Sequence, residues 1–231
     1  MMDPAGRVVM LSGAARGIGR ALMERLLAAG YAVSAGLRDP GRLAAHDALS
    51  VHAYDAGLVG SAEEWVAGTM SRHGRIDAVV NAAGINPRAT MFDADESAFD
   101  AMWNVNAKGP MRMIRAAWPH LVACGEGRVV NISSLSGKRV RNDNLGYAMS
   151  KFAVMALTQD VRRAGWEYGI RATAVCPGFV DTDMTAHVKH VPREKMSRPE
   201  DIAALIEAVL RLPNTASVAE LLVNWRHEDT L

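Results

Sequence analysis

The chain has 231 residues, of which 49% are hydrophobic and 22% are charged, and its formal net charge is +1 at pH 7. This composition is typical of a globular protein and excludes a disordered or collagen-like chain. The near-neutral charge and the lack of a dense Lys/Arg run disfavour nucleic acid or an anionic membrane as a partner.

Neither export nor membrane insertion is predicted. Residues 1–7 before the first apolar run leave no room for a signal peptide, and glycines and charges interrupt every hydrophobic run before it reaches the length of a bilayer span. We therefore expect a cytoplasmic protein.

Cys124 and Cys176 lie far apart without a CxxC spacing, so we expect two buried, reduced thiols rather than a disulfide or a zinc site.

Short β-branched runs alternate with longer segments of helical periodicity, the pattern of repeated βαβ units around a parallel sheet. The predicted strands are 8–11, 32–35, 51–54, 76–81, 128–133, 171–176 and 220–224. The predicted helices are 18–29, 62–73, 96–122, 147–166 and 199–210. No linker or repeat divides the chain, so we predict one α/β domain over residues 1–231, with a doubly wound, seven-stranded and mainly parallel sheet.

This arrangement predicts where a ligand binds. In an open parallel sheet, ligands bind outside the carboxyl ends of the strands, so the residues that close each strand are the candidates. The segment 177–198 follows a strand and lacks clear periodicity. Long connections of this kind often form active-site lids.

A glycine-rich segment directly follows the first predicted strand and leads into a helix. Gly13, Gly17 and Gly19 permit a tight turn and a close approach of the backbone to a phosphate, and a helix N-terminus attracts the anion. Their GxxxGxG spacing departs from the GxGxxG fingerprint, so an ordinary strand-to-helix turn is the alternative.

Tyr147 and Lys151 are four residues apart, which places them on one face of a helix. A nearby cation favours a phenolate, so we expect Lys151 to lower the pKa of Tyr147 toward neutral pH. Ser134 follows the fifth strand and is placed to polarise a substrate carbonyl, although a turn or cap is the alternative for an isolated Ser. Alone, Asn81 and Asn106 would be interpreted as structural.

These features occur in the order typical of one family. From residue 8 to about residue 224 the chain resembles the short-chain dehydrogenase/reductases, through the glycine-rich loop, residues 81–84, Asn106, Ser134, Tyr147, Lys151 and residues 177–182. The resemblance implies a Rossmann-like, three-layer α/β/α fold. It also implies that Tyr147 is the general acid/base, Ser134 orients the substrate oxygen, Lys151 binds the nicotinamide ribose, and Asn106 holds a water of the proton relay.

The resemblance also assigns the residues that bind the dinucleotide. They are Gly13, Arg16, Gly17, Ile18, Gly19, Arg38, Asp55, Asn81, Ala82, Gly84, Tyr147, Lys151, Pro177, Gly178, Val180 and Thr182. Ser12 replaces a common Thr but keeps the hydroxyl, and Ala82 stands where Asn is frequent. The C-terminus lacks the Gly-Gly strand of many members, which leaves open its share of the substrate pocket and the subunit contacts.

Cofactor choice depends on the end of the second strand. In NAD-preferring dinucleotide folds an acidic residue there accepts hydrogen bonds from the ribose and repels a 2′-phosphate. Leu37 occupies that place and Arg38 follows it, while Arg16 lies on the same side of the site by resemblance. Two guanidinium groups match a phosphate well, so we expect NADP(H) to be preferred over NAD(H). The alternative is that both arginines are solvated surface residues.

The expected substrate pocket is mostly apolar and shows no evident arginine clamp. It draws on Ser134, Leu135, Asn144, Phe179, Met184 and His187. Asp183, His187 and His190 have a spacing compatible with metal ligands, but a solvated loop is favoured and no metal is expected. From the resemblance and from apolar residues on helices 96–122 and 147–166 we expect a homo-oligomer, a tetramer or a dimer.

We therefore predict an NADP(H)-dependent oxidoreductase that interconverts a small carbonyl compound and its alcohol, with Tyr147 exchanging the proton. One alternative is a catalytically silent NADP(H)-binding regulator, although Ser134, Tyr147 and Lys151 are all present. Another is an isomerase, dehydratase or epimerase on the same fold, because a fold does not determine chemistry.

Overall fold

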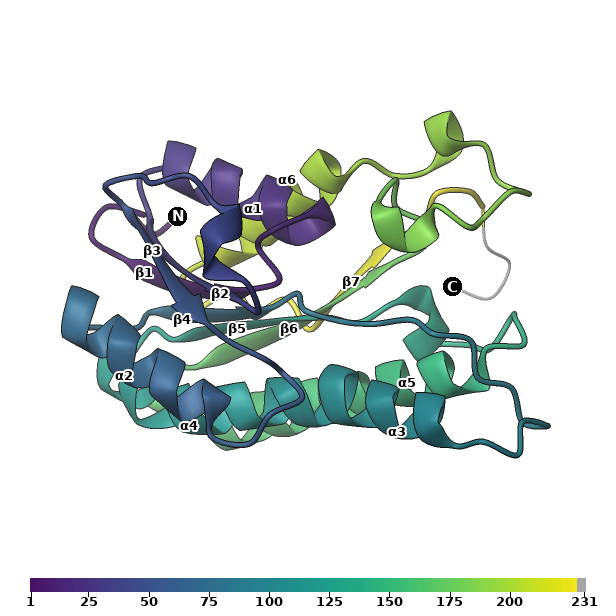
Figure 1. The fold of residues 1–231 in the computed structure, drawn as a ribbon. Helices are drawn as coiled ribbons and strands as arrows, with labels where there is room; N and C mark the ends of the chain where they lie inside the picture. Colours follow the sequence, from purple (N-terminus) through teal and green to yellow (C-terminus); the bar gives the residue numbers. More distant parts are fainter. Residues whose placement is uncertain (228–231) are drawn as a thin grey trace.

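A computed structural model describes residues 1–227, so the last four residues of the domain predicted over 1–231 lie outside the described residues. Within this part, seven strands form one sheet in the order β3-β2-β1-β4-β5-β6-β7 (Figure 1). All neighbouring strands are parallel, which confirms the predicted sheet. The strands are β1 (Val8–Ser12), β2 (Ala32–Leu37), β3 (Leu49–Ala53), β4 (Ala78–Asn81), β5 (Arg128–Ile132), β6 (Arg171–Pro177) and β7 (Glu220–Val223).

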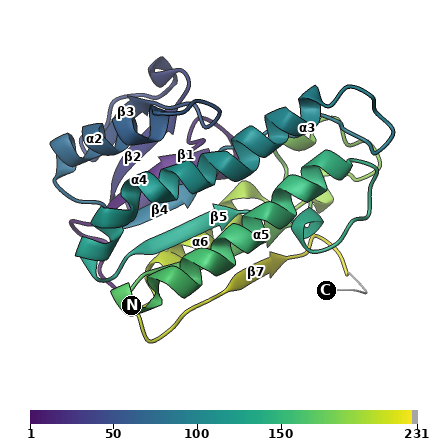
Figure 2. The ribbon, with the colours of Figure 1, turned by 90° about the horizontal axis from the view of Figure 1, so that it is seen from below.

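Helices cover both faces of the sheet and complete the predicted three-layer, Rossmann-like fold (Figures 1 and 2). One face carries α1 (Gly17–Ala28) and α6 (Pro199–Leu210). The other face carries α2 (Ser61–His73), α4 (Gly109–Cys124) and α5 (Leu145–Gly165). Figure 2 shows α4 and α5 side by side beneath the sheet, with α3 (Ser97–Met102) extending beyond the end of α4.

The residues of β1 explain why helices are needed on both sides. All five are buried, and successive side chains of a strand point to opposite faces. Val9 and Leu11 pack in the core beneath α1 and α6, whereas Met10 packs in the core of α2 and α4. A parallel sheet with apolar side chains on both faces is stable only when both faces are covered.

The predicted helix over 96–122 is correct in extent but not regular throughout. Between α3 and α4 lies a π-helical turn, Trp103–Lys108, which contains Asn106. Turns of this type often occur at functional sites, because they redirect side chains within a continuous helix. The predicted stop after α1 is confirmed by Gly30, which has a φ of +96°.

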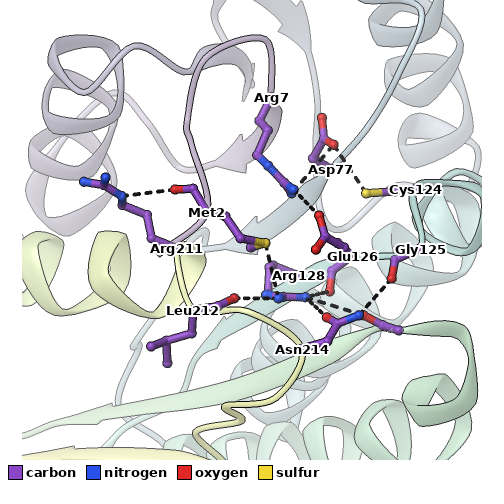
Figure 3. Close-up of polar contacts among 12 residues, drawn as sticks. Met2, Arg7, Asp77, Cys124, Gly125, Glu126, Arg128, Arg211, Leu212 and Asn214 are labelled. Carbon is purple, nitrogen blue, oxygen red and sulfur yellow. Dashed lines mark hydrogen bonds and ion pairs between the residues drawn. The ribbon is translucent and has the colours of Figure 1, made fainter.

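A buried polar network ties together the amino ends of the strands (Figure 3). Arg128, at the start of β5, is 2% exposed and donates to the Leu212 carbonyl at 2.6 Å and to the Asn214 side chain at 2.9 Å. Asp77, just before β4, is 1% exposed and accepts from the Val8 amide at 2.8 Å. The network secures the edge of the sheet that lies opposite the carboxyl ends.

Both cysteines are free in the structure. Cys176 is buried as expected, and burial raises the pKa of its thiol to about 11. The expected burial is wrong for Cys124, which is half-buried and donates to Asp77 Oδ1 at 3.3 Å. Across residues 1–227, none of the helices combines the length and the apolar character that a membrane span requires.

Candidate active site

A cavity of about 1320 Å³ lies along the carboxyl ends of the strands. The loop after β1 and the ends of β2, β4, β5 and β6 line it, together with the segment predicted to be a lid. The order of strands reverses between β1 and β4, and such a switch point is where open α/β sheets bind ligands. The fold therefore places the cavity where the sequence predicts a site.

The glycine-rich loop has a backbone suited to a phosphate. Gly13 and Gly17 adopt positive φ angles of +75° and +54°, which strain residues that have a Cβ. A Cβ on Gly19 would lie 2.2 Å from the Gly13 carbonyl oxygen, so only glycine fits there. α1 begins at Gly17 without an acidic residue in its first turn, which leaves its N-terminus attractive to an anion.

Ser12 anchors this loop to the turn after β4. Its Oγ accepts hydrogen bonds from the backbone amides of Ala82 at 3.1 Å and Ala83 at 3.2 Å. The Ser12 hydroxyl, which stands where the family commonly has a Thr hydroxyl, therefore holds the glycine-rich loop against the turn after β4. Because Ala82 takes part through its backbone, its small side chain does not disturb this contact.

Basic side chains gather in the cavity next to the end of β2. Leu37 closes β2 and is 5% exposed, so no carboxylate stands at that point. Arg16, Arg38 and Arg42 all line the cavity. Arg16 Nη1 lies 3.7 Å from Asp183 Oδ2 in an exposed ion pair. Asp39 also lines the cavity, and its carboxylate accepts from the Gly41 amide at 3.2 Å.

Tyr147 and Lys151 lie one turn apart on α5 and both line the cavity. The Lys151 ammonium is 5.5 Å from the centre of the Tyr147 ring and donates to the Ile132 carbonyl at 2.8 Å. This carbonyl ends β5, so the sheet itself positions the lysine. The structure therefore brings together the two residues that the sequence places on one helical face.

The pKa values of this pair differ from the expectation. Burial raises the pKa of Tyr147 to about 12, and the opposing effect comes from a hydrogen bond with Ser134 rather than from Lys151. Burial also lowers the pKa of Lys151 to about 8. Desolvation outweighs the attraction between the two groups, because it disfavours the charged form of each. The protein alone thus keeps Tyr147 as a neutral phenol, which is a proton donor.

Ser134 caps a turn and also faces the tyrosine. Its Oγ accepts from the Ser136 amide at 3.1 Å and donates to the Pro177 carbonyl at 3.4 Å. It also lines the cavity, and its hydroxyl acts to lower the pKa of Tyr147. The structural and the catalytic interpretations of this serine are therefore compatible.

Asn106 and Asn81 are not among the residues that line the cavity. Asn106 is 1% exposed, and its side chain accepts from the Ile85 amide and donates to the Ile85 carbonyl, both at 2.9 Å, and to Ser150 Oγ at 3.1 Å. Asn81 is buried and donates to Asn131 Oδ1 at 2.8 Å. Asn106 thus holds the backbone of Ile85 next to the cavity, whereas Asn81 joins β4 to β5 through Asn131.

The other predicted cofactor contacts reach the cavity. They are Gly13, Arg16, Gly17, Ile18, Gly19, Arg38, Asp55, Ala82, Gly84, Tyr147, Lys151, Pro177, Gly178, Val180 and Thr182. A Cβ on Gly17 would contact the Thr182 side chain at 3.1 Å, so the glycine-rich loop and the segment after β6 lie close together.

The six predicted substrate residues line the cavity as well: Ser134, Leu135, Asn144, Phe179, Met184 and His187. The polar groups of Asn144 have structural partners, however. Its Oδ1 accepts from the Ala89 and Tyr147 amides, and its Nδ2 donates to Asn86 Oδ1 at 2.8 Å and to the Pro87 carbonyl at 3.0 Å. This residue caps α5 and thereby positions Tyr147.

Among residues 1–227, no group of three or more His, Cys, Asp or Glu side chains is arranged to hold a metal.

Sequence reasoning missed several lining residues: Arg42, Arg139, Arg141, Trp225 and Arg226. Two signals point to them. Arg139 and Arg141 stand in the short segment between Ser134 and Tyr147, and Trp225 follows the carboxyl end of β7. Trp225 packs against Phe179 with ring centres 5.7 Å apart, so the C-terminal segment does contribute to the pocket.

The fold and the cavity define a doubly wound α/β protein with a ligand site at the carboxyl ends of its strands, and comparison with known proteins gives the family. Residues 7–192 match the sequence profile described as short chain dehydrogenase. The chain belongs to the short-chain dehydrogenase/reductase family of oxidoreductases.

Individual members of the family and solved structures are similar to this chain over most of its length. "Agropine synthesis reductase" from Rhizobium rhizogenes is 38% identical over 217 residues, which cover 91% of this chain and 50% of that protein. An uncharacterized oxidoreductase from Staphylococcus saprophyticus is 31% identical, with 96% and 99% covered. The structure of an alcohol dehydrogenase from Thermococcus sibiricus, complexed with 5-hydroxy-NADP, has a TM-score of 0.87 at 28% identity, with 96% and 99% covered. This chain spans about half the length of the agropine synthesis reductases that it matches.

Proposed function

We propose that the protein is an NADP(H)-dependent oxidoreductase that interconverts a small carbonyl compound and its alcohol. The observation that carries this proposal is one cavity lined by a glycine-rich phosphate loop, by Ser134, and by Tyr147 and Lys151 on α5. The loop provides a binding site for a dinucleotide, and the three side chains provide the groups for proton exchange.

The residues present fit a nicotinamide dinucleotide. The backbone from Gly13 to Gly19 and the N-terminus of α1 would hold the pyrophosphate, because the first turn of α1 lacks acidic residues. Lys151 would bind the nicotinamide ribose, and Thr182 the carboxamide. When bound, the cofactor supplies a hydride to the substrate or accepts one from it.

Tyr147 would supply the proton in the reductive direction. As a hydride reaches the carbonyl carbon, the oxygen gains charge and takes the phenolic proton, which leaves Tyr147 as a phenolate that solvent reprotonates. Ser134 would hold the same oxygen by a hydrogen bond and thereby orient the substrate. The raised pKa of Tyr147, about 12, keeps the phenol protonated before the reaction.

The test is an assay of the purified protein with NADPH and a panel of aldehydes and ketones, in which NADPH loss and alcohol formation are both measured. We expect equal amounts of each. Product formed without net NADPH consumption would indicate an isomerase or dehydratase. Tight NADPH binding without turnover across the panel would indicate a silent regulator.

Preference for NADP(H) is a separate part of the proposal, and it rests on Leu37, Arg16, Arg38 and Arg42. An apolar residue at the end of β2 removes the carboxylate that would repel a 2′-phosphate, and the arginines provide forked donors for it. The alcohol dehydrogenase relative from T. sibiricus was solved with a modified NADP.

Kinetics with both cofactors test this preference. Arg38→Gln or Arg42→Gln should raise the KM for NADPH roughly 3- to 30-fold, the range for losing a partly solvated, charge-assisted contact, and leave the KM for NADH nearly unchanged. Arg72→Gln is the matched control, because Arg72 is exposed on α2 and does not line the cavity. An equal or higher kcat/KM of the wild type for NADH would contradict the preference.

A further inference from the structure

The loop that follows β3, residues 54–59, forms one wall of the cavity. Its first three residues line the cavity, and the Tyr54 amide donates to the Leu37 carbonyl at 2.8 Å. This bond places the β3 loop beside the end of β2, where the 2′-phosphate of NADP(H) would bind. The tip of the loop is open to solvent, since Leu58 and Val59 are 62% and 82% exposed. Polar contacts from other segments therefore matter for the position of the loop.

The π-helical turn and the start of α4 supply such contacts. Asn104 Nδ2 donates to the Gly57 carbonyl at 2.8 Å. Asn104 Oδ1 accepts from Arg112 Nη2 at 2.8 Å, and Arg112 Nη1 donates to the Ala56 carbonyl at 3.1 Å. The two side chains thus hold each other and bind two successive carbonyls of the β3 loop.

Close packing accompanies these hydrogen bonds. A Cβ on Gly109, the first residue of α4, would lie 2.8 Å from the Ala56 side chain, so a larger residue does not fit there. A Cβ on Gly57 would lie 3.4 Å from Asn104 Nδ2 and 3.7 Å from the Val105 side chain. The β3 loop is therefore in direct contact with the π-helical turn and with α4.

The π-helical turn serves both ends of the cavity. Asn104 binds the β3 loop, and Val105 lines the cavity. Asn106 donates to the Ile85 carbonyl and to Ser150 on α5, the helix of the catalytic residues. A π-helical turn redirects side chains within a continuous helix, and turns of this type often occur at functional sites. Here one turn contacts the adenosine end through Asn104 and the catalytic end through Asn106.

We propose that Asn104 and Arg112 are positioning residues for the adenosine half of the cofactor, because they hold the β3 loop in the conformation that binds it. They act through the backbone of Ala56 and Gly57 and do not line the cavity themselves. The inference rests on the proposed function, which requires that cofactor. A loop that is ordered before binding loses less conformational entropy when the ligand arrives, so the affinity should depend on this pair.

Binding of the adenosine half alone tests the inference. Calorimetry gives the Kd of the purified protein for NADPH and for 2′,5′-ADP, the fragment that carries the adenosine and its phosphates. Asn104→Asp keeps the size of the side chain but removes the donor to the Gly57 carbonyl. Arg112→Gln removes the guanidinium that donates to the Ala56 carbonyl. Each change should raise both Kd values by the same factor, about 3- to 30-fold, because the whole loss falls on the adenosine half.

Two further variants control the binding experiment. Arg115→Gln removes the same charge from an exposed position of α4 and should leave both Kd values within about twofold. Arg112→Lys keeps one donor and should weaken binding less than Arg112→Gln. It also keeps the test valid if Arg112→Gln does not fold.

Amide hydrogen exchange of the free protein gives a readout that needs no cofactor. In the β3 loop the Gly57 amide donates to Asp55 Oδ1 at 2.8 Å, and the Leu58 amide donates to the Asp55 carbonyl at 3.0 Å. Both amides should exchange about fivefold faster in Asn104→Asp, because the loop opens more often without its anchor. Exchange in the loop after β4 should stay unchanged, whereas a general loss of stability would accelerate exchange in both loops.

The outcomes separate this inference from the proposed function. Kd values within about twofold of the wild type for both variants, or a larger loss for NADPH than for 2′,5′-ADP, overturn the inference and leave the oxidoreductase standing. If both ligands lose affinity equally but the wild type reduces no carbonyl, the inference stands and the proposed function fails. A wild type that binds neither ligand overturns both.

Discussion

Lys151 shows at the scale of one residue how a catalytic site lowers stability. The residue is 6% exposed, and burial lowers its pKa to about 8 from 10.5. Below about pH 8 the lysine is charged in both the folded and the unfolded state, and the folded state carries the full cost of burying that charge. As the pH rises from about 8 toward 10.5, the unfolded chain loses the proton as well and this penalty disappears.

Lys151→Met should therefore stabilise the protein and inactivate it. We expect the free energy of unfolding to rise by about 1–3 kcal/mol at pH 7, after allowance for the lost bond to the Ile132 carbonyl, and by less at pH 10. Denaturant titrations at both pH values measure this. Lys108→Met, at an exposed position, is the control and should change stability little. A less stable Lys151→Met variant at pH 7 would contradict the assigned burial cost.

Sequence alone predicted individual residues best where backbone chemistry restricts the choice. Gly13 and Gly17 are required by positive φ angles, and Leu37 follows from the end of a buried strand. Asn144 and Arg139 were harder to interpret, because the role of a polar loop side chain depends on neighbours from distant segments. The partners of Asn144, for example, come from the loop after β4.

At the scale of elements, the Asp77 carboxylate joins the amino ends of β1 and β4. It accepts from the amide that begins β1 and receives two hydrogen bonds from Arg75. It also forms an ion pair with Arg7 (Figure 3). Removing one member of such a group leaves buried donors and charges without a partner, which costs more than the original interaction contributed.

Asp77→Ala should lower the free energy of unfolding by about 3–5 kcal/mol. Asp77→Asn should cost less, because an amide oxygen still accepts from the Val8 amide, and this variant keeps the test valid if the first does not fold. Asp100→Ala, at an exposed position of α3, should have an effect within about 0.5 kcal/mol. Denaturant titration provides the measurement, and a loss below about 1 kcal/mol for Asp77→Ala would contradict the structural role.

The positions of the elements follow from sequence periodicity, and the ends of predicted helices and strands lie within two residues of the observed ends. The π-helical turn Trp103–Lys108 was not predicted. Its extra residue per turn leaves the apolar pattern of the helix almost unchanged, so periodicity cannot reveal it. The bond between Asn106 and the backbone of Ile85, which joins the turn to the loop after β4, is a tertiary contact.

At the scale of the whole molecule, α4, α5 and the π-helical turn before α4 present apolar side chains to solvent. Trp103, Met111, Met149 and Phe152 are 45%, 39%, 49% and 43% exposed. The two helices lie side by side on the same face of the sheet (Figure 2). A second copy of the chain that packs against this face would bury these residues by two-fold symmetry.

We therefore expect light scattering to give the mass of a dimer or tetramer at micromolar concentration. Phe152→Glu should shift the protein toward the monomer, because the contact would bury an unpaired charge twice. Tyr168→Glu, at a 53% exposed position beyond the end of α5, is the control and should leave the mass unchanged. A monomeric wild type would contradict this expectation.

The central claim is that Tyr147 exchanges the proton while the hydride moves, and Tyr147→Phe tests it most directly. The substitution removes the phenolic proton but keeps the ring that packs on α5. We predict that kcat for carbonyl reduction falls roughly 100- to 10,000-fold while the Kd for NADPH stays within about threefold, because proton donation contributes to the transition state and not to cofactor binding. Near-normal turnover by the pure, folded variant would contradict the assignment of Tyr147 as the catalytic acid.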